Sequence, residues 1–217
     1  MQVEIWSDIA CPWCLVGTVR FERAVAETGI DVDVVYRAFE LDPRVPTGGD
    51  APRLVDYLAN KFGDRGRVEA AHTRLAEAGA ELGIDFQWSK MRRANTFDAH
   101  RLLTWALRTE GSPAQRALKK ALLQAYFTDG ADITDHETLA DLAASVGLDR
   151  QQAAEVLASD AEFAAVREEE ARAHEQGITA VPTFVVEGEW MLQGALDTDK
   201  WVRALTTLSA ELAAREP

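Results

Sequence analysis

The sequence predicts an α/β fold in which two strand-containing segments, one at each end of the chain, frame a long helical insertion. Three observations favour this fold. The first forty residues read as strand, helix, strand. Residues 51 to about 175 then follow a helical period almost throughout, and a strand signal returns at Pro182. The arrangement predicts one α/β domain that is interrupted by helices.

The first segment begins with a short strand over Val3–Ser7, followed by an amphipathic helix over Cys11–Glu27. Thr28-Gly29 ends that helix, because glycine is the usual residue just beyond a helix end. Residues Asp31–Phe39 (DVDVVYRAF) alternate between polar and apolar side chains and predict a second strand.

The segment Leu41–Gly49 contains two prolines and two glycines and is the clearest boundary in the sequence. Beyond it the chain is rich in Ala, Leu, Glu and Arg, with apolar residues recurring every three or four positions. One short extended stretch, Ile84–Trp88, interrupts this helical pattern. We therefore expect an all-helical insertion over residues 42–175, with breaks near Gly63, Gly83, Met91–Asn95, Glu110–Pro113, Thr128–Asp132 and Gly147–Asp149.

The final segment predicts a hairpin and a closing helix. Pro182–Val186 and Trp190–Leu192 read as two strands with Gly188 in the turn, and Thr198–Ala213 reads as a helix. Residues 1–41 and 176–217 are thus expected to form one discontinuous domain. Neither half is expected to fold without the other.

Composition narrows the possible functions. The net charge of −13 and the pI near 4.8 argue against a nucleic-acid partner, because phosphate binding needs a basic surface. No apolar run approaches the roughly 20 residues of a membrane span, and no signal peptide is visible after Met1. We expect a cytoplasmic protein without a membrane partner. In the reducing cytoplasm a disulfide is more often catalytic or sensing than structural.

The tetrapeptide Cys11-Pro12-Trp13-Cys14 holds the only two cysteines of the chain and follows the first strand directly. At helical rise the two Cα atoms lie roughly 5 Å apart, which allows a disulfide to close. Pro12 favours the first helical position, so Cys11 is expected at the N-cap. There, free amides and the helix dipole would lower the pKa of Cys11 and make it a nucleophile. The motif predicts a dithiol redox site.

A zinc site, a structural disulfide and chance spacing each account less well for the two cysteines. Zinc would need four ligands, but there is no third cysteine, and His72, His100, His136 and His174 are not spaced as a ligand pair. A structural disulfide in so short a loop would constrain little chain entropy. Chance spacing leaves the proline and the preceding strand unexplained. Redox chemistry accounts best for the motif, and no metal or bound cofactor is implied.

Several segments together resemble the thioredoxin superfamily, in particular proteins of the DsbA type and their FrnE-like subgroup, which is related to 2-hydroxychromene-2-carboxylate isomerases. They occur in the family's order over nearly the whole length. The resemblance implies a thioredoxin-like fold with a large all-helical insertion. The segments that carry it are Ser7–Gly17, Asn95–Arg101, Gly130–Ile133 and Gly177–Val185.

The resemblance also implies roles for site residues. Cys11 would be the exposed attacking thiol and Cys14 the buried resolving thiol. Val181 and Pro182 would be joined by a cis peptide bond and lie opposite the motif, where the Val181 backbone pairs with an extended substrate segment. An ordinary turn proline at a strand start is the alternative for Pro182. Pro12 and Trp13 would also contact substrate, with Trp13 affecting substrate choice.

Two departures from the family pattern stand out. Ala180 occupies a position where glycine is expected before the Val-Pro pair. The isomerase relatives typically carry serine where Cys11 stands and use glutathione, so the presence of both cysteines favours dithiol exchange.

His100 and Asp8 each have two possible roles. In the family, the helix start near Asn95 lies close to the active site, so His100 could face the substrate groove, although a lone histidine on a helix is more often packed or exposed. Asp8 could accept a proton from the resolving thiol or belong to the helix cap.

The sequence therefore predicts a thiol-disulfide oxidoreductase that acts on a disulfide-containing protein or small molecule and exchanges with an unidentified thiol reductant. Two alternatives stay open. One is an isomerase or transferase with a low-molecular-weight thiol as cosubstrate, and the other is a redox-sensing or chaperone-like binding module.

Overall fold

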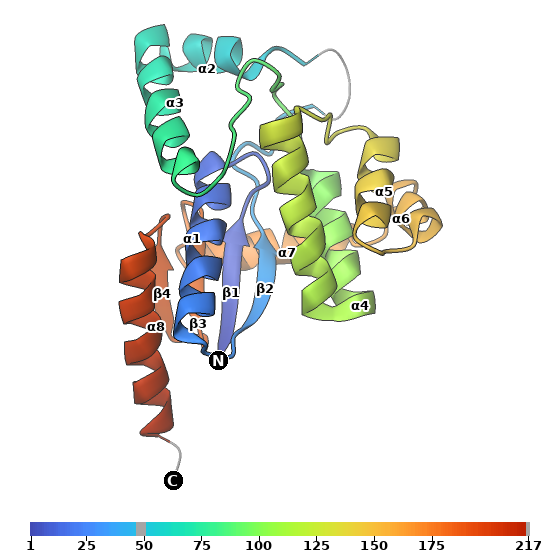
Figure 1. Ribbon diagram of the computed structural model, residues 1–217. Coiled ribbons are helices and arrows are strands. Elements are labelled where there is room, and N and C mark those ends of the chain that lie inside the picture. The colour runs from blue at the N-terminus through green and yellow to red at the C-terminus, as the bar shows by residue number, and fades with distance from the viewer. Residues whose placement is uncertain (47–50, 216–217) are drawn as a thin grey trace.

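The computed structural model describes residues 1–46 and 51–215, and a four-stranded sheet lies at its centre (Figure 1). The strand order is β2-β1-β3-β4, in which β1 is parallel to β2 and antiparallel to β3, and β3 is antiparallel to β4. The strands are β1 (Gln2–Ser7), β2 (Asp33–Ala38), β3 (Thr183–Val186) and β4 (Trp190–Gln193). The first and last segments of the chain thus share one sheet.

Helices cover both faces of this sheet. Helices α1 (Pro12–Thr28) and α8 (Thr198–Ala213) lie on one face, and α7 (Phe163–Glu175) lies on the other (Figure 1). The alternation of β1 explains the division, because Val3 and Ile5 pack with α1 and α8 while Trp6 packs on the α7 side.

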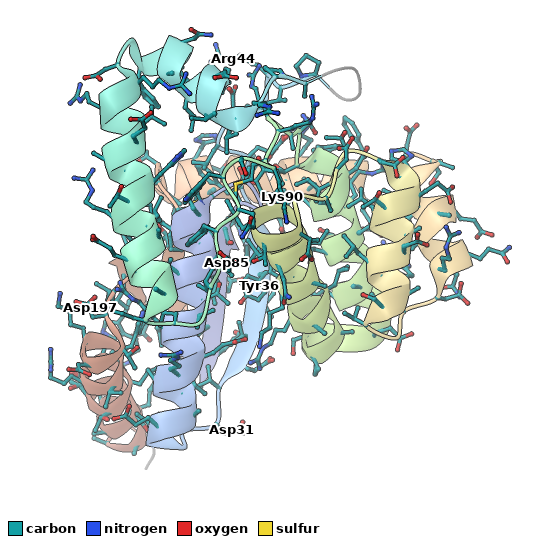
Figure 2. All side chains as sticks on the ribbon, turned by 45° about the horizontal axis from the view of Figure 1, so that its top comes forward. Asp31, Tyr36, Arg44, Asp85, Lys90 and Asp197 are labelled. Carbon is teal, nitrogen blue, oxygen red and sulfur yellow. The ribbon has the colours of Figure 1, made fainter. Side chains whose placement is uncertain are left out.

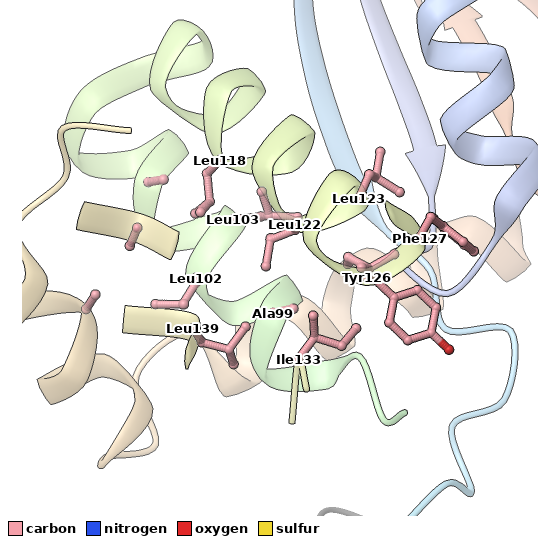
Figure 3. Packing of buried hydrophobic residues seen from close by; sticks show 14 of the residues in the cluster. Ala99, Leu102, Leu103, Leu118, Leu122, Leu123, Tyr126, Phe127, Ile133 and Leu139 are labelled. Carbon is pink, nitrogen blue, oxygen red and sulfur yellow. The ribbon is translucent and has the colours of Figure 1, made fainter. Parts of the chain in front are cut away.

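The remaining helices form a second apolar core beside the sheet. Ten of its residues, from Ala99 to Leu139, are labelled where the helices meet in Figure 3. The longest helix bends at Gly111, whose φ of 83° interrupts the helical backbone two residues before Pro113. The helices are α2 (Leu54–Phe62), α3 (Arg65–Ala80), α4 (Phe97–Gln124), the π-helix η1 (Ala125–Asp129), α5 (His136–Ser145) and α6 (Arg150–Leu157).

The predicted fold class is confirmed, and most predicted elements lie within two residues of the observed ones. Residues 84–88 interrupt the helices as predicted and do not join the sheet, and the Gln87 amide donates to the Phe127 carbonyl of η1. The predicted boundary at Leu41–Gly49 lies partly outside the described residues. The division into two domains stays a prediction. No helix in the described ranges is long and apolar enough to cross a membrane.

Candidate active site

The CxxC motif lies where β1 ends and α1 begins. Pro12 occupies the first helical position and Cys11 is the N-cap residue, as the sequence predicts. The Cys14 amide donates to the Cys11 carbonyl at 3.0 Å, which closes the first turn around the motif. Both cysteines are free thiols. The helix start therefore holds the two sulfur-bearing residues on one turn.

The loop before β3 faces Cys11. The Cys11 Sγ lies 3.6 Å from the Val181 carbonyl oxygen, and the Val181–Pro182 peptide bond is cis. Gly17 allows this approach, because a Cβ at that position would come within 2.9 Å of the Pro182 Cγ. The structure thus brings together the cysteine and Val-Pro motifs that the sequence singled out.

Both thiols are buried, which corrects the expectation that Cys11 is exposed. Cys11 is 4% exposed and Cys14 is fully buried, whereas Trp13 between them is 40% exposed. The Val181 loop covers Cys11, and this contact comes from a segment far away in the sequence. Cys11 remains the less enclosed of the two sulfurs.

A buried lysine lies beneath the motif. Lys119 of α4 is 1% exposed, and its Nζ donates to the Ser7 carbonyl at 3.3 Å and lies 5.5 Å from the centre of the Tyr36 ring (Figure 2 labels Tyr36 on β2). Burial lowers the pKa of Lys119 to about 8, against the opposing effects of Cys14, Asp8 and Cys11. The helical insertion therefore supplies a cation directly to the redox site.

This environment reverses the predicted acidity of the thiols. The pKa of Cys11 is raised, first by its hydrogen bond with Cys14 and then by burial. Although burial raises it, the pKa of Cys14 is held below its usual value by the Cys11 thiol, the Lys119 charge and the Ser7 hydroxyl.

The N-cap argument for Cys11 was wrong for a structural reason. The Cys14 amide favours a Cys11 thiolate, but the Cys11 side chain makes no capping hydrogen bond. The favourable charge lies under Cys14 instead. The Lys119 charge therefore favours the thiolate form of the inner sulfur, Cys14.

Asp8 and His100 form a second buried pair behind the motif. Asp8 accepts hydrogen bonds from the Ala10 amide at 3.3 Å and the Leu41 amide at 2.8 Å, and its Oδ1 lies 3.5 Å from the His100 Nε2. Burial raises the pKa of Asp8, but His100, the Leu41 amide and Thr96 together lower it below its usual value. Asp8 is thus an ionised, well-bonded carboxylate that fixes the loop before Cys11.

The prediction that His100 faces a substrate groove is not supported by this geometry. His100 is 2% exposed and points at Asp8, because the start of α4 packs against the loop between β1 and α1. Its position suits it to hold Asp8.

Sequence reasoning missed Lys119, although a signal was present. The second arm of α4 has an apolar stripe that includes Leu118, Leu122 and Leu123, and Lys119 lies within that stripe. A lysine on the buried face of a helix needs a specific partner, which here is the redox site.

In the described part of the chain, no three His, Cys, Asp or Glu side chains converge as metal ligands would. The titratable groups that do converge are two thiols, one lysine ammonium, and one carboxylate with its neighbouring imidazole. Together they can hold and redistribute a thiolate charge, as disulfide exchange requires.

Comparison with known proteins gives concordant results. The sequence model of the DSBA-like thioredoxin domain family matches residues 2–206. The uncharacterized protein YwbO of Bacillus subtilis (strain 168) is 27% identical over 213 residues, covering 95% of this chain and 96% of YwbO.

Solved structures extend the comparison. The crystal structure of a probable DsbA oxidoreductase from Streptomyces coelicolor is 36% identical with a TM-score of 0.90, covering 100% of this chain and 92% of that one. A 2-hydroxychromene-2-carboxylate isomerase shares the fold at 15% identity, with a TM-score of 0.72 and 100% of both chains covered. The cytosolic disulfide reductase DsbM of Pseudomonas aeruginosa shares it at 19% identity, with a TM-score of 0.66 and coverage of 97% and 99%.

Proposed function

The chain belongs to the DSBA-like thioredoxin domain family, and we propose that it is a thiol-disulfide oxidoreductase whose redox centre is the Cys11–Cys14 pair. The observation that carries the proposal is the position of the chain's only two cysteines. They share the first turn of α1, with the Val181 carbonyl against one sulfur and a buried lysine near the other. This arrangement serves thiolate chemistry and has no evident structural use.

Exchange begins at Cys11, because Cys14 is fully enclosed. The Cys11 thiolate attacks one sulfur of the substrate disulfide, forms a mixed disulfide and releases the other substrate sulfur as a thiolate. Cys14, as a thiolate, then attacks the Cys11 sulfur and releases the second substrate thiolate. The dithiol has lost two electrons and become a disulfide, and the substrate disulfide has become two thiols.

The buried cation makes the second step possible. Cys14 must ionise in an interior that would otherwise raise its pKa, and Lys119 stabilises that charge. Proton transfer from Cys11 to Cys14 within the hydrogen-bonded pair places the charge on Cys11 for the first attack, and Cys14 then gives this proton to the released substrate thiolate before the second attack. Lys119 acts here as a positioning residue through its electric field.

Substrate contacts come from the surface around Cys11. Pro12 and exposed Trp13 lie on one side, and the Val181–Pro182 loop lies on the other with a carbonyl that can accept a hydrogen bond. The reverse exchange uses the same groups, so the net direction follows the potential of the thiol partner. We place the reaction in the cytoplasm, in line with a chain whose only oxidisable cysteine pair is the redox centre.

The test is trapping of the mixed disulfide. The reduced Cys14→Ser protein is incubated with insulin or with a small disulfide, and adducts are identified by non-reducing mass spectrometry. We expect a stable adduct on Cys11, and none on Cys14 in the Cys11→Ser control. Wild type should catalyse the reduction of insulin by dithiothreitol, and neither variant should.

Other outcomes would favour the alternatives. Full activity of Cys14→Ser with a thiol cosubstrate would indicate an isomerase or transferase. Absence of turnover with any disulfide would indicate a binding module and overturn the proposal.

A further inference from the structure

An apolar pocket of about 400 Å³ opens beside the CxxC motif. It lies between helices α2 and α3, the Trp88 segment and the loop that carries the motif, at the end of the molecule where Figure 2 labels Arg44. Its size falls within the roughly 300–1,000 Å³ that is typical of small-molecule sites. The lining residues are Ala10, Pro12, Leu41, Leu54, Leu58, Phe62, Arg67, Val68, Ala71, His72, Leu75 and Trp88.

Helix α2 directs its apolar stripe into this pocket. Leu54, Leu58 and Phe62 follow at intervals of four residues and all line it. No residue of α2 is buried, and Phe62 is 61% exposed. An amphipathic helix normally buries its apolar side chains against the rest of the protein. Here those side chains remain available to an occupant.

The opposite wall is closely packed and aromatic. Trp88 stacks on His72 with the ring centres 4.0 Å apart and on Phe86 with the centres 4.8 Å apart. Val68 and Leu75 of α3 are buried behind the same surface. Burial lowers the pKa of His72, so its ring is uncharged at neutral pH. The occupant therefore meets the unburied apolar side chains of α2 on one side and the stacked Trp88 and His72 rings on the other.

The pocket borders the reactive sulfur. Ala10 and Pro12 both line it, and they are the residues on either side of Cys11. Leu41, which is 48% exposed, extends the apolar surface at the same edge. A group bonded to the Cys11 sulfur therefore lies next to the pocket, because both chain neighbours of Cys11 belong to the lining. Among the described residues of the lining, the only ionised side chain is that of Arg67, which is exposed on α3.

We propose that this pocket binds an apolar group of one or two aromatic rings, carried on the small-molecule sulfur that forms the mixed disulfide with Cys11. The inference rests on the proposed function and names its substrate class: small disulfides or thiols with an apolar aromatic substituent. A concave site of this volume between two helices suits a compact group, and its apolar lining offers few partners to a polypeptide backbone. Burial of the exposed Phe62 and Leu41 side chains by the occupant would favour binding.

The experiment compares two dialkyl disulfides whose sulfurs have similar intrinsic reactivity. Bis(2-phenylethyl) disulfide carries the aromatic group and bis(2-hydroxyethyl) disulfide does not. For each disulfide, the rate at which it oxidises the reduced protein is divided by the rate at which it oxidises dithiothreitol. This ratio corrects for the intrinsic reactivity of the disulfide. We expect wild type to prefer the aromatic disulfide at least roughly tenfold. The non-thiol analogue 2-phenylethanol should inhibit that reaction competitively.

Two variants locate the preference. Leu58→Gln places an amide in the pocket at a half-buried position, and it should remove most of the preference, which is measured as the ratio of the two corrected rates. Met191→Gln is the matched control on β4, 47% exposed and outside the lining, and it should keep the preference.

The outcomes separate the two proposals. Equal corrected rates for the two disulfides, or a preference that Leu58→Gln retains, would overturn the pocket assignment. Stronger inhibition by an apolar peptide than by 2-phenylethanol would assign the pocket to a polypeptide and likewise overturn it. If neither disulfide oxidised the protein faster than it oxidises dithiothreitol, the proposed oxidoreductase function itself would fail.

Discussion

Replacing Lys119 with methionine should stabilise the reduced protein and impair its chemistry. Methionine has a similar length and volume, so the packing around Ser7 and Tyr36 should survive. The substitution removes a charge that burial disfavours. It also removes the cation that favours a Cys14 thiolate.

The magnitude follows from the pKa of Lys119. Its lowering from 10.5 to about 8 means that keeping this lysine charged in the folded state costs about 3 kcal/mol below pH 8. Loss of the hydrogen bond to the Ser7 carbonyl offsets about 1 kcal/mol of that. We therefore expect the free energy of unfolding of Lys119→Met to exceed that of wild type by about 2 kcal/mol at pH 7.

The sign of the pH dependence is fixed. The pKa of Lys119 is lower in the folded protein than in the unfolded chain, so the unfolded chain binds more protons between pH 8 and 10.5. The stability of wild type therefore rises with pH over that window. The increase in the free energy of unfolding caused by Lys119→Met should accordingly reach its full size at pH 7 and be smaller at pH 9.5. Urea unfolding of the reduced proteins at both values measures it.

The neighbouring lysine provides a matched control. Lys120 is exposed and pairs with Glu22 at 3.2 Å, so Lys120→Met should change stability by less than about 1 kcal/mol. In the same Lys119→Met protein the reduction potential should fall by on the order of 30 mV, since the reduced form loses thiolate stabilisation. A loss of stability at pH 7, or a gain of equal size at both pH values, would refute this reasoning.

Glu40, Gly17 and the two thiols each give a further prediction. Burial, together with the charge of Glu170, raises the pKa of Glu40 to about 7, so Glu40 stabilises the fold below pH 4.5 and that contribution is lost as the pH rises through 7. Urea unfolding should therefore show wild type losing about 1–3 kcal/mol relative to Glu40→Gln between pH 4.5 and 8, and parallel curves would contradict it. Gly17→Ala should lower stability by about 1 kcal/mol and slow insulin reduction, because the new Cβ displaces the Pro182 ring; unchanged kinetics would show that the contact is irrelevant. Iodoacetamide should modify Cys11 in the folded reduced protein and reach Cys14 only after unfolding, as peptide mass mapping would show; early Cys14 labelling would contradict its enclosure.

Local sequence patterns are sufficient to predict the helices and strands and to place the redox motif at a helix start. The regular apolar spacing of Thr198–Ala213 predicts a helix with the same bounds as α8. The start of α1 at Pro12 followed equally from the fixed φ and missing amide hydrogen of proline. These features depend on neighbours within one or two helical turns, which a sequence displays directly.

The electrostatics of the site depend on contacts between segments that are far apart in the sequence. The predicted low pKa of Cys11 considered the helix start alone, whereas the thiol acidity depends on Lys119, the Val181 loop and the mutual hydrogen bond of the sulfurs. His100 likewise turned out to face Asp8. The pocket beside Cys11 also exists only because α2 and α3 stand over the motif. Burial and charge act through space, so the groups that set a pKa or line a pocket can lie anywhere in the sequence.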